Sequence, residues 1–554
     1  MRACLLAAPR HAGPLPLRFA AAWHPRMAVR NLAVRAAIQD GQEHVCHAPN
    51  ALFVAQMRAI RCRGACSPVE CGEPDSESKE DGLMNFPDDF LWGAATASYQ
   101  IEGAANEDGR GASIWDAFSH TPGNVYRGDT GDIACDHFHR LEEDLDLMAE
   151  LGLKAYRFSV AWPRIQPEGS GEVNRAGLDF YRRLVEGLRR RNIEPMLTLY
   201  HWDLPQALED RGGWTSRETS ERFAEYAEIV YEALSDDVEF WITLNEPWVA
   251  SWLGHEAGVH APGRRSTSEA LLATHHLLLG HGLAMERMRS ANREGNHLGA
   301  TLSLSPVRAS REKDEKAAKL VDGNVNRLYL DPLLRGEYPK DMVEHYREVS
   351  DFGFVRDGDL EKISSPNDFL GVNFYMRHTV REDDSPEASF PSVGARIVIP
   401  HNVRKTAMGW PVEPDGLTEL LVRVNEEYGP IPIYVTENGI AVHDYVDPEG
   451  SVNDKERVEY LDSHFRAAGE AMERGVDVRG YMVWSLMDNF EWAEGYSKRF
   501  GLVYVDYPTG KRIPKSSFRW YSDVMRRGGV GEAFRSKNTR SKERVARSHA
   551  PSPS

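Results

Sequence analysis

Cysteine is scarce in most of this 554-residue chain, and no long apolar run occurs in it. Five of the six cysteines lie within the first 71 residues, which leaves only Cys135 for the rest of the chain. A body of this size with one cysteine cannot depend on disulfides, which is typical of a reducing compartment, so we expect a cytoplasmic protein. No segment approaches the roughly 18 consecutive apolar residues of a membrane-spanning helix, so we expect no membrane partner.

Basic residues are also scarce in the centre of the chain. The formal net charge of all 554 residues is −18. Residues 1–83 hold 10 Lys or Arg and 8 Asp or Glu, residues 526–554 hold 8 and 2, and the segment between them holds 48 and 74. An acidic body repels phosphate backbones and anionic lipid headgroups, which argues against nucleic acid and membrane surfaces as partners. A small neutral ligand fits this charge better.

The two ends differ in composition from the rest. The first 39 residues hold six arginines and no acidic residue, the charge bias of a transit peptide, but they contain no serine. We interpret residues 1–83 as a disordered or non-native N-terminal extension and residues 526–554 as a disordered basic tail. Residues 84–525 are then expected to form one domain.

A pattern repeats through this domain: a short apolar run, then polar or aromatic residues, then an amphipathic helix. The runs occupy residues 90–99, 155–160, 195–200, 240–244, 298–304, 369–374, 433–436 and 480–486. Most are almost continuously hydrophobic, as is typical of parallel strands covered on both faces. Eight strands alternating with helices predict an α/β fold, a single (β/α)₈ TIM barrel with long βα loops.

Unusual residues gather where these runs end, which is where barrels of this kind carry their active sites. The clusters are His201-Trp202-Asp203, Asn245-Glu246-Pro247, Asn373-Phe374-Tyr375, Glu437-Asn438-Gly439 and, after Trp484, Glu491-Trp492. The chain contains no Gly-rich phosphate loop, GxSxG elbow or HExxH pair. We therefore expect no cofactor and no metal.

Carboxyl, amide and aromatic side chains together suit the cleavage of a sugar linkage. Glycoside hydrolysis usually uses two carboxyl groups on either side of one bond, about 5–5.5 Å apart in retaining enzymes. Glu246 and Glu437 end the fourth and seventh runs and could face each other across the barrel mouth. Each residue alone is weak evidence, because a Glu before Pro is usually a loop residue and a Trp on a strand usually belongs to the core.

Longer motifs resemble glycoside hydrolase family 1, the β-glucosidase family, over roughly residues 85–525. They are FLWGAATASYQIEG from Phe90, YRFSVAWPRIQPEG from Tyr156, TLYHWDLPQAL from Thr198, WITLNEP from Trp241, HAPG from His260, DFLGVNFY from Asp368, YVTENG from Tyr434 and WSLMDNFEWAEGY from Trp484. The resemblance implies the barrel already expected from periodicity. It also implies a retaining β-glucosidase that acts on terminal β-D-glucosyl residues, with β-galactosidase or β-fucosidase side activity.

The resemblance implies roles residue by residue. Glu246 matches the acid/base and Glu437 the nucleophile, while Asn245 matches the residue that bonds the sugar 2-hydroxyl. Arg157 and Tyr375 match positions that hold the nucleophile, so Glu437 is expected to stay ionised and Glu246 to be protonated. The expected substrate-binding residues are Gln100, His201, Asn245, Tyr375, Trp484, Glu491, Trp492 and Phe500.

Several alternatives remain open from the sequence. The 6-phospho-glycosidases lack a Glu at the position of Glu491, so its presence favours a free 6-hydroxyl, although Lys498 is near it in sequence. A transglycosylase would use the same residues, and a non-catalytic sugar-binding protein would have lost a carboxylate. Expected ligands are small β-glucosides or short cello-oligosaccharides. No motif indicates the leaving group or the oligomeric state.

Overall fold

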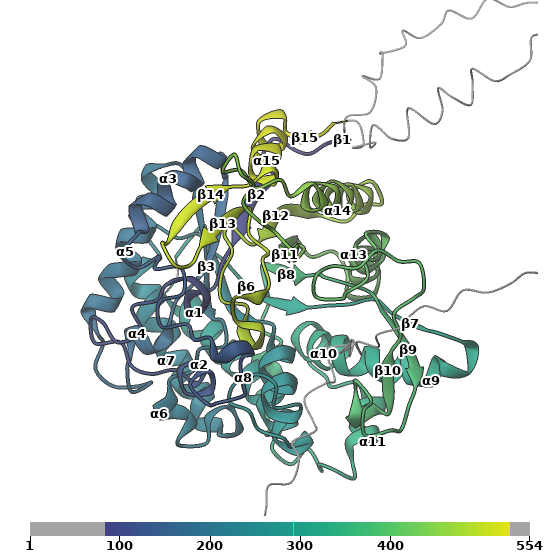
Figure 1. Ribbon diagram of the computed structural model, residues 1–554. Coiled ribbons are helices and arrows are strands. Elements are labelled where there is room, and N and C mark those ends of the chain that lie inside the picture. The colour runs from purple at the N-terminus through teal and green to yellow at the C-terminus, as the bar shows by residue number, and fades with distance from the viewer. Residues whose placement is uncertain (1–83, 292, 532–554) are drawn as a thin grey trace, which may run out of the picture. The chain divides into compact units, whose positions relative to one another are not determined.

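The computed structural model describes residues 84–291 and 293–531. The expected extension at residues 1–83 lies outside this range, as do residues 532–554. Helix α15 (Ser516–Arg527) and strand β15 (Gly529–Val530) continue the folded chain past Arg526, where the basic tail was expected to begin. Strand β15 pairs with β1 (Met84–Asn85), so the first and last described elements lie together (Figure 1).

Eight parallel strands form the closed barrel predicted from the sequence. In barrel order they are β11 (Ile433–Asn438), β12 (Val478–Trp484), β2 (Leu91–Ala95), β3 (Ala155–Ser159), β4 (Glu194–Tyr200), β5 (Phe240–Asn245), β6 (His297–Ser303) and β8 (Phe369–Asn373). Each matches one predicted run. The first strand is shorter than expected, because the chain turns after Ala95 into helix α1 (Ser98–Ile101).

Helices surround the barrel (Figure 1). They are α2 (Ile114–Ser119), α3 (Leu141–Leu151), α4 (Trp162–Ile165), α5 (Arg175–Arg190), α6 (Gln206–Glu209), α7 (Arg217–Leu234), α8 (Thr267–Ser290), α9 (Glu315–Asp322), α10 (Leu328–Arg335), α11 (Lys340–Tyr346), α12 (Asp359–Ile363), α13 (Asp415–Tyr428) and α14 (Lys455–Glu473). Two π-helical segments, η3 (Val249–Glu256) and η5 (Gly323–Arg327), follow β5 and α9. None of the helices within the described residues has the length and apolarity needed to span a membrane.

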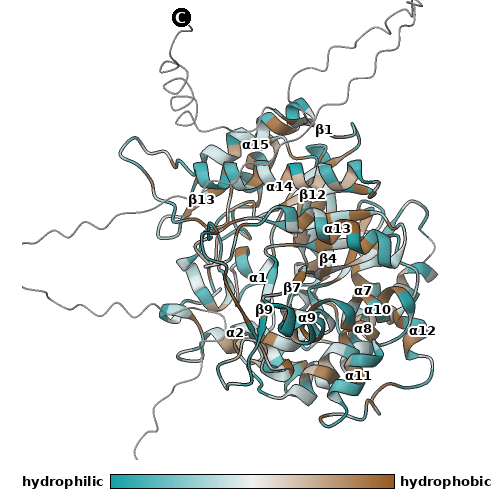
Figure 2. Cartoon of the chain, turned by 90° about the vertical axis from the view of Figure 1, so that its right-hand side faces the viewer, coloured by the Kyte–Doolittle hydropathy of each residue, from teal (hydrophilic) through white to brown (hydrophobic). Residues whose placement is uncertain are grey.

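Amphipathic spacing explains why the long helices lie against the barrel. In α5 the buried residues Leu178, Tyr181, Leu184, Val185 and Leu188 recur every three or four positions, which puts them on one face. Figure 2 shows the same alternation on α13 and α14, where hydrophobic and hydrophilic stretches follow each other along the ribbon. The helices thus cover the outer face of the strands with their apolar sides.

Besides the β1–β15 pair, two small sheets lie outside the barrel in the described part of the chain. One contains β10 (Ala395–Ile397), β9 (His378–Glu382) and β7 (Val307–Ala309), from the loops after β6 and β8. The other is the hairpin of β13 (Val503–Asp506) and β14 (Lys511–Pro514), which follows the loop after β12. These elements are part of the long βα loops that the sequence predicts.

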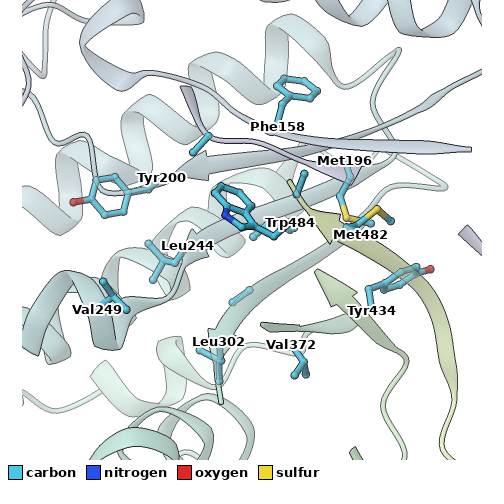
Figure 3. Close-up of a cluster of buried hydrophobic side chains, with 14 of the residues drawn as sticks. Phe158, Met196, Tyr200, Leu244, Val249, Leu302, Val372, Tyr434, Met482 and Trp484 are labelled. Atoms are coloured by element: carbon cyan, nitrogen blue, oxygen red, sulfur yellow. The ribbon is translucent and has the colours of Figure 1, made fainter. Parts of the chain in front are cut away.

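The barrel interior changes from apolar to polar along the strands. Figure 3 draws part of the apolar core, with Met196 projecting from β4 and Met482 and Trp484 from β12. Nearer the carboxyl ends, Thr436 donates to Asn373 Oδ1 at 2.8 Å, and Thr301 lies 3.3 Å from Thr436, hydroxyl to hydroxyl. The hydrogen-bonded side chains of Thr301, Thr436 and Asn373 thus lie between the apolar core and the groups at the strand ends.

Two strands depart from regular alternation where they carry the expected carboxylates. The register of β11 shifts between Val435 and Glu437, and the register of β5 shifts between Ile242 and Asn245. Thr436 and Glu437 are consecutive, yet both reach side chains of other barrel strands. Such irregularities re-aim a side chain, which explains how Glu437 comes to face the barrel interior.

Candidate active site

The Glu437 carboxyl group is held on both oxygens. Arg157 Nη1 on β3 donates to Oε1 at 2.6 Å, and the Tyr375 hydroxyl after β8 donates to Oε2 at 2.7 Å. Arg157 is itself fully buried and bonds Thr198 and the Thr436 carbonyl. The expected contacts of Arg157 and Tyr375 with Glu437 are therefore present, and they fix the carboxylate from two directions.

Asn245 joins this group to a neighbouring histidine. Its Oδ1 accepts from Arg157 Nη2 at 2.6 Å and from Asn373 Nδ2 at 3.1 Å, which leaves Nδ2 facing His201 Nε2 at 3.0 Å. Since an amide nitrogen only donates, Nε2 of His201 accepts and Nδ1 carries the proton. Burial, and then the charge of Arg157, lower the pKa of His201 well below its ordinary value, so the ring is neutral.

Glu246 directly follows β5, and Asn373 links its side chain to that of Asn245. Asn373 Nδ2 donates to Glu246 Oε1 at 2.8 Å as well as to Asn245, so Asn373 connects the two residues that end β5. The backbone of Glu246 is in the left-handed region, with φ of 46°. A bulky residue adopts this conformation only where its surroundings hold it, and such residues concentrate at active sites.

The two carboxyl groups differ in their electrostatic surroundings. Burial, and then the negative charge of Glu437, raise the pKa of Glu246 to about 8. Burial also raises the pKa of Glu437 above its ordinary value, but the charge of Arg157 and the hydrogen bonds from Tyr375 and Arg157 oppose this. Glu437 is therefore the first of the pair to ionise. The expected protonated Glu246 and charged Glu437 agree with this order, although burial makes the charge on Glu437 less favourable than expected.

The other predicted residues form a wall of aromatic and polar groups. The His201 ring stacks at 5.9 Å on both Trp484 and Trp492, and Tyr375 contacts Phe500 edge-on at 6.2 Å. Gln100 Nε2 donates to Asn489 Oδ1 and to the Phe490 carbonyl, which ties α1 to the loop before Glu491. All eleven predicted residues thus belong to interconnected structure around the strand ends.

Three of these residues have buried polar atoms without a hydrogen-bond partner within the described chain. They are Gln100 Oε1, His201 Nδ1 and Glu491 Oε2. Burial, and then the charge of Glu437, raise the pKa of Glu491 to about 8. An unpaired buried polar group is costly, so these atoms fit a ligand that supplies hydroxyl groups. A site of amides, carboxyls and stacked aromatics suits an uncharged sugar without a cofactor.

Two residues of the site were not assigned a function from the sequence. Asn373 was recognisable only as one of several polar residues at a strand end, and its link between Asn245 and Glu246 depends on the fold. Trp410 lies 5.5 Å from Tyr375 and 6.2 Å from Phe500, ring to ring. It comes from a long loop with no motif, so no sequence signal indicated it.

Comparison with known proteins agrees with this geometry. The family described as "Glycosyl hydrolase family 1" matches residues 83–530. "Thermostable beta-glucosidase B" of Thermobispora bispora is 52% identical over 477 residues, covering 85% of this chain and 98% of that protein. "Beta-glucosidase A" of Thermotoga maritima is 47% identical over 452 residues, covering 81% and 99%. "Bifunctional beta-D-glucosidase/beta-D-fucosidase" of Bifidobacterium breve is 48% identical over 455 residues, covering 79% and 97%.

Solved structures show the same likeness. The AHE enzyme from Alicyclobacillus herbarius has a TM-score of 0.77 at 50% identity, covering 80% of this chain and 97% of that one. The beta-glucosidase from Thermotoga maritima in complex with cyclophellitol has a TM-score of 0.77 at 47% identity, covering 81% and 100%. Each solved structure is matched over almost its whole length and matches about four fifths of this chain.

Proposed function

Because the chain belongs to glycosyl hydrolase family 1, we propose that it is a retaining β-glucosidase that releases terminal, non-reducing β-D-glucosyl residues. The observation that carries the proposal is the pair of buried carboxyl groups with different partners. Glu437 accepts from Arg157 and Tyr375, whereas Glu246 accepts from Asn373. One group is suited to attack as an anion, and the other is suited to donate a proton.

In the first step, the ionised Glu437 attacks the anomeric carbon while Glu246 gives its proton to the leaving oxygen. The bond from the anomeric carbon to that oxygen breaks, and a covalent glycosyl–Glu437 ester forms. Arg157 and Tyr375 stabilise the carboxylate anion before attack, and each donates one hydrogen bond to a different oxygen. A carboxylate oxygen can accept more than one such contact, so the bonds do not block the attack. Asn245, bonded to both Arg157 and Asn373, is placed to hold the sugar 2-hydroxyl.

In the second step, water attacks the anomeric carbon, the bond from that carbon to Glu437 breaks, and Glu437 leaves as a carboxylate. The ester is uncharged, so the negative charge that raises the pKa of Glu246 disappears when it forms. Glu246 can then stay ionised and accept a proton from the attacking water. Two inversions at the anomeric carbon restore the β configuration.

Glu491 supports a substrate with a free 6-hydroxyl. Its carboxyl group can bond a neutral hydroxyl in either protonation state and would repel a phosphate when ionised. The nearby Lys498 donates to the Ala407 carbonyl at 3.0 Å and lies 3.7 Å from Glu494. We propose small β-glucosides and short cello-oligosaccharides as substrates, with β-fucosidase or β-galactosidase side activity, in a cytoplasmic protein. The B. breve relative, named for both glucosidase and fucosidase activity, supports the side activity.

A substrate panel tests this function. The full chain should hydrolyse 4-nitrophenyl β-glucoside, and proton NMR should detect β-glucose before the α anomer appears by mutarotation. Cellobiose, lactose, the corresponding galactoside and fucoside and a 6-phospho-glucoside complete the panel, with an added alcohol to detect transfer. A first product in the α form, or a preference for the phosphorylated substrate, would contradict the proposal.

The pH profile follows from the two carboxyl groups. Since Glu246 must carry a proton in the first step and burial raises its pKa to about 8, kcat/KM should fall as the pH rises through about 8. On the acid side it should fall when Glu437 becomes protonated. In Glu246→Ala, assayed with 2,4-dinitrophenyl β-glucoside, the alkaline fall should disappear. If it remains, it belongs to Glu491, whose pKa burial also raises to about 8.

A further inference from the structure

A buried asparagine on a different loop reaches the segment that carries Glu246. Asn324 lies in η5, beyond α9, and its side chain is almost completely buried. Its Oδ1 accepts from Trp248 Nε1 at 2.8 Å, and its Nδ2 donates to the Tyr346 hydroxyl at 3.0 Å. Trp248 is only two residues after Glu246, so this hydrogen bond ties the chain just beyond the carboxyl group to a second βα loop.

The left-handed backbone of Glu246 needs support on both sides. At Glu246 itself, the backbone N–H donates to the Thr301 carbonyl at 2.9 Å. Beyond it, Ser251 Oγ donates to the Pro247 carbonyl at 2.7 Å, and Asn324 holds the Trp248 ring. Pro247 has a restricted φ, so fixing the peptide on one side and the indole on the other leaves Glu246 little freedom to relax.

We propose that Asn324 is a positioning residue for Glu246, which it orients by holding the Trp248 indole. Among the described residues Asn324 bonds Trp248 and Tyr346, and no hydrogen bond joins it to Glu246 or Glu437. It therefore acts on the acid/base through the chain rather than by contact with the substrate. The inference depends on the proposed role of Glu246 as proton donor.

Leaving-group dependence distinguishes poor orientation of a proton donor from general loss of stability. Phenol needs a proton as it leaves, whereas 2,4-dinitrophenol leaves readily as the anion, and the two aryl groups are similar in shape. General acid catalysis contributes roughly 100- to 10,000-fold, and small displacements of catalytic groups remove part of it. Asn324→Leu should therefore lower kcat/KM about tenfold for phenyl β-glucoside and less than about threefold for 2,4-dinitrophenyl β-glucoside.

Trp248→Phe makes the same test from the other partner, because it keeps an aromatic ring but removes the N–H group. It should change the ratio of the two rates in the same direction, and the double variant should be no worse than the more affected single variant. Tyr346→Phe is the matched control, since it removes the second hydrogen bond of Asn324 and leaves the bond to Trp248 in place. Its ratio should match that of the unaltered protein.

Glu246→Ala provides the reference. If it shows no leaving-group dependence, the proposed role of Glu246 is wrong. If it does, and Asn324→Leu lowers both rates equally, or Tyr346→Phe changes the ratio as much as Asn324→Leu does, the positioning role of Asn324 is wrong. If Asn324→Leu does not yield folded protein, Trp248→Phe makes the test. A larger loss with phenyl β-glucoside than with 2,4-dinitrophenyl β-glucoside supports the positioning role, and an equal loss with both contradicts it.

Discussion

Replacing Glu437 by alanine should lower kcat/KM for 4-nitrophenyl β-glucoside by more than about 10⁴-fold, because the variant lacks the carboxylate that forms the covalent intermediate. The loss should occur without a large change in fold, since Arg157 keeps its hydrogen bonds to Thr198 and Asn245 and Tyr375 keeps its ring contact with Phe500. Steady-state kinetics with this substrate measure the loss, and circular dichroism checks the fold.

Azide or formate should restore part of this activity. Each is small enough to occupy the space left by the carboxyl group and to attack the anomeric carbon from the same side. With azide the expected product is the α-glucosyl azide, because only one inversion takes place. Glu449→Ala, which removes an exposed carboxyl group from the loop after β11, is the control and should keep full activity. Full activity in Glu437→Ala would disprove the assignment of the nucleophile.

Replacing Glu246 by alanine should give a loss that depends on the leaving group. For phenyl β-glucoside, kcat/KM should fall roughly 100- to 10,000-fold, the usual contribution of general acid catalysis. For 2,4-dinitrophenyl β-glucoside the fall should be much smaller, because this leaving group needs no proton. A series of aryl glucosides, plotted as log kcat/KM against the acidity of the phenol, should show a steeper slope than the unaltered enzyme.

Added azide separates this role from that of Glu437. In Glu246→Ala, azide should speed the second step by replacing water, which needs a base, and the product should be the β-glucosyl azide because two inversions take place. The opposite anomer from that of Glu437→Ala is therefore expected. A uniform loss across the aryl series, or an α-azide product, would contradict the assignment of Glu246 as acid/base.

The sequence predicted the barrel and most of its site because both depend on local patterns. Each of the eight apolar runs became a barrel strand, and polar residues at the ends of those runs met at one side, as parallel strands require. Arg157 and Tyr375 contact Glu437, as the family resemblance indicated, and Asn245 lies beside them, bonded to Arg157. Spacing and motif were sufficient because these residues belong to the strands themselves or follow them directly.

Features that depend on three-dimensional packing could not be predicted in this way. Asn373 gains its position from a hydrogen bond to each of two residues at the end of another strand, and Trp410 arrives from a long loop. The sequence past Arg526 was interpreted as a basic tail. Its strand β15 pairs with β1, which is more than 400 residues earlier, and no local pattern indicates such a pairing. The pKa of Glu437 depends on the balance between burial and Arg157, which no motif expresses.

The register shifts in β5 and β11 imply that the face to which each carboxyl group points depends on the exact number of residues in its strand. Successive side chains of a regular strand point to opposite faces. Removing one residue at either irregularity would therefore turn the carboxylate from the sugar toward the surrounding helices, where a charge is expensive to bury. Substitutions in these strands can adjust the enzyme gradually, but a change in their length would leave a barrel with the right residues on the wrong face.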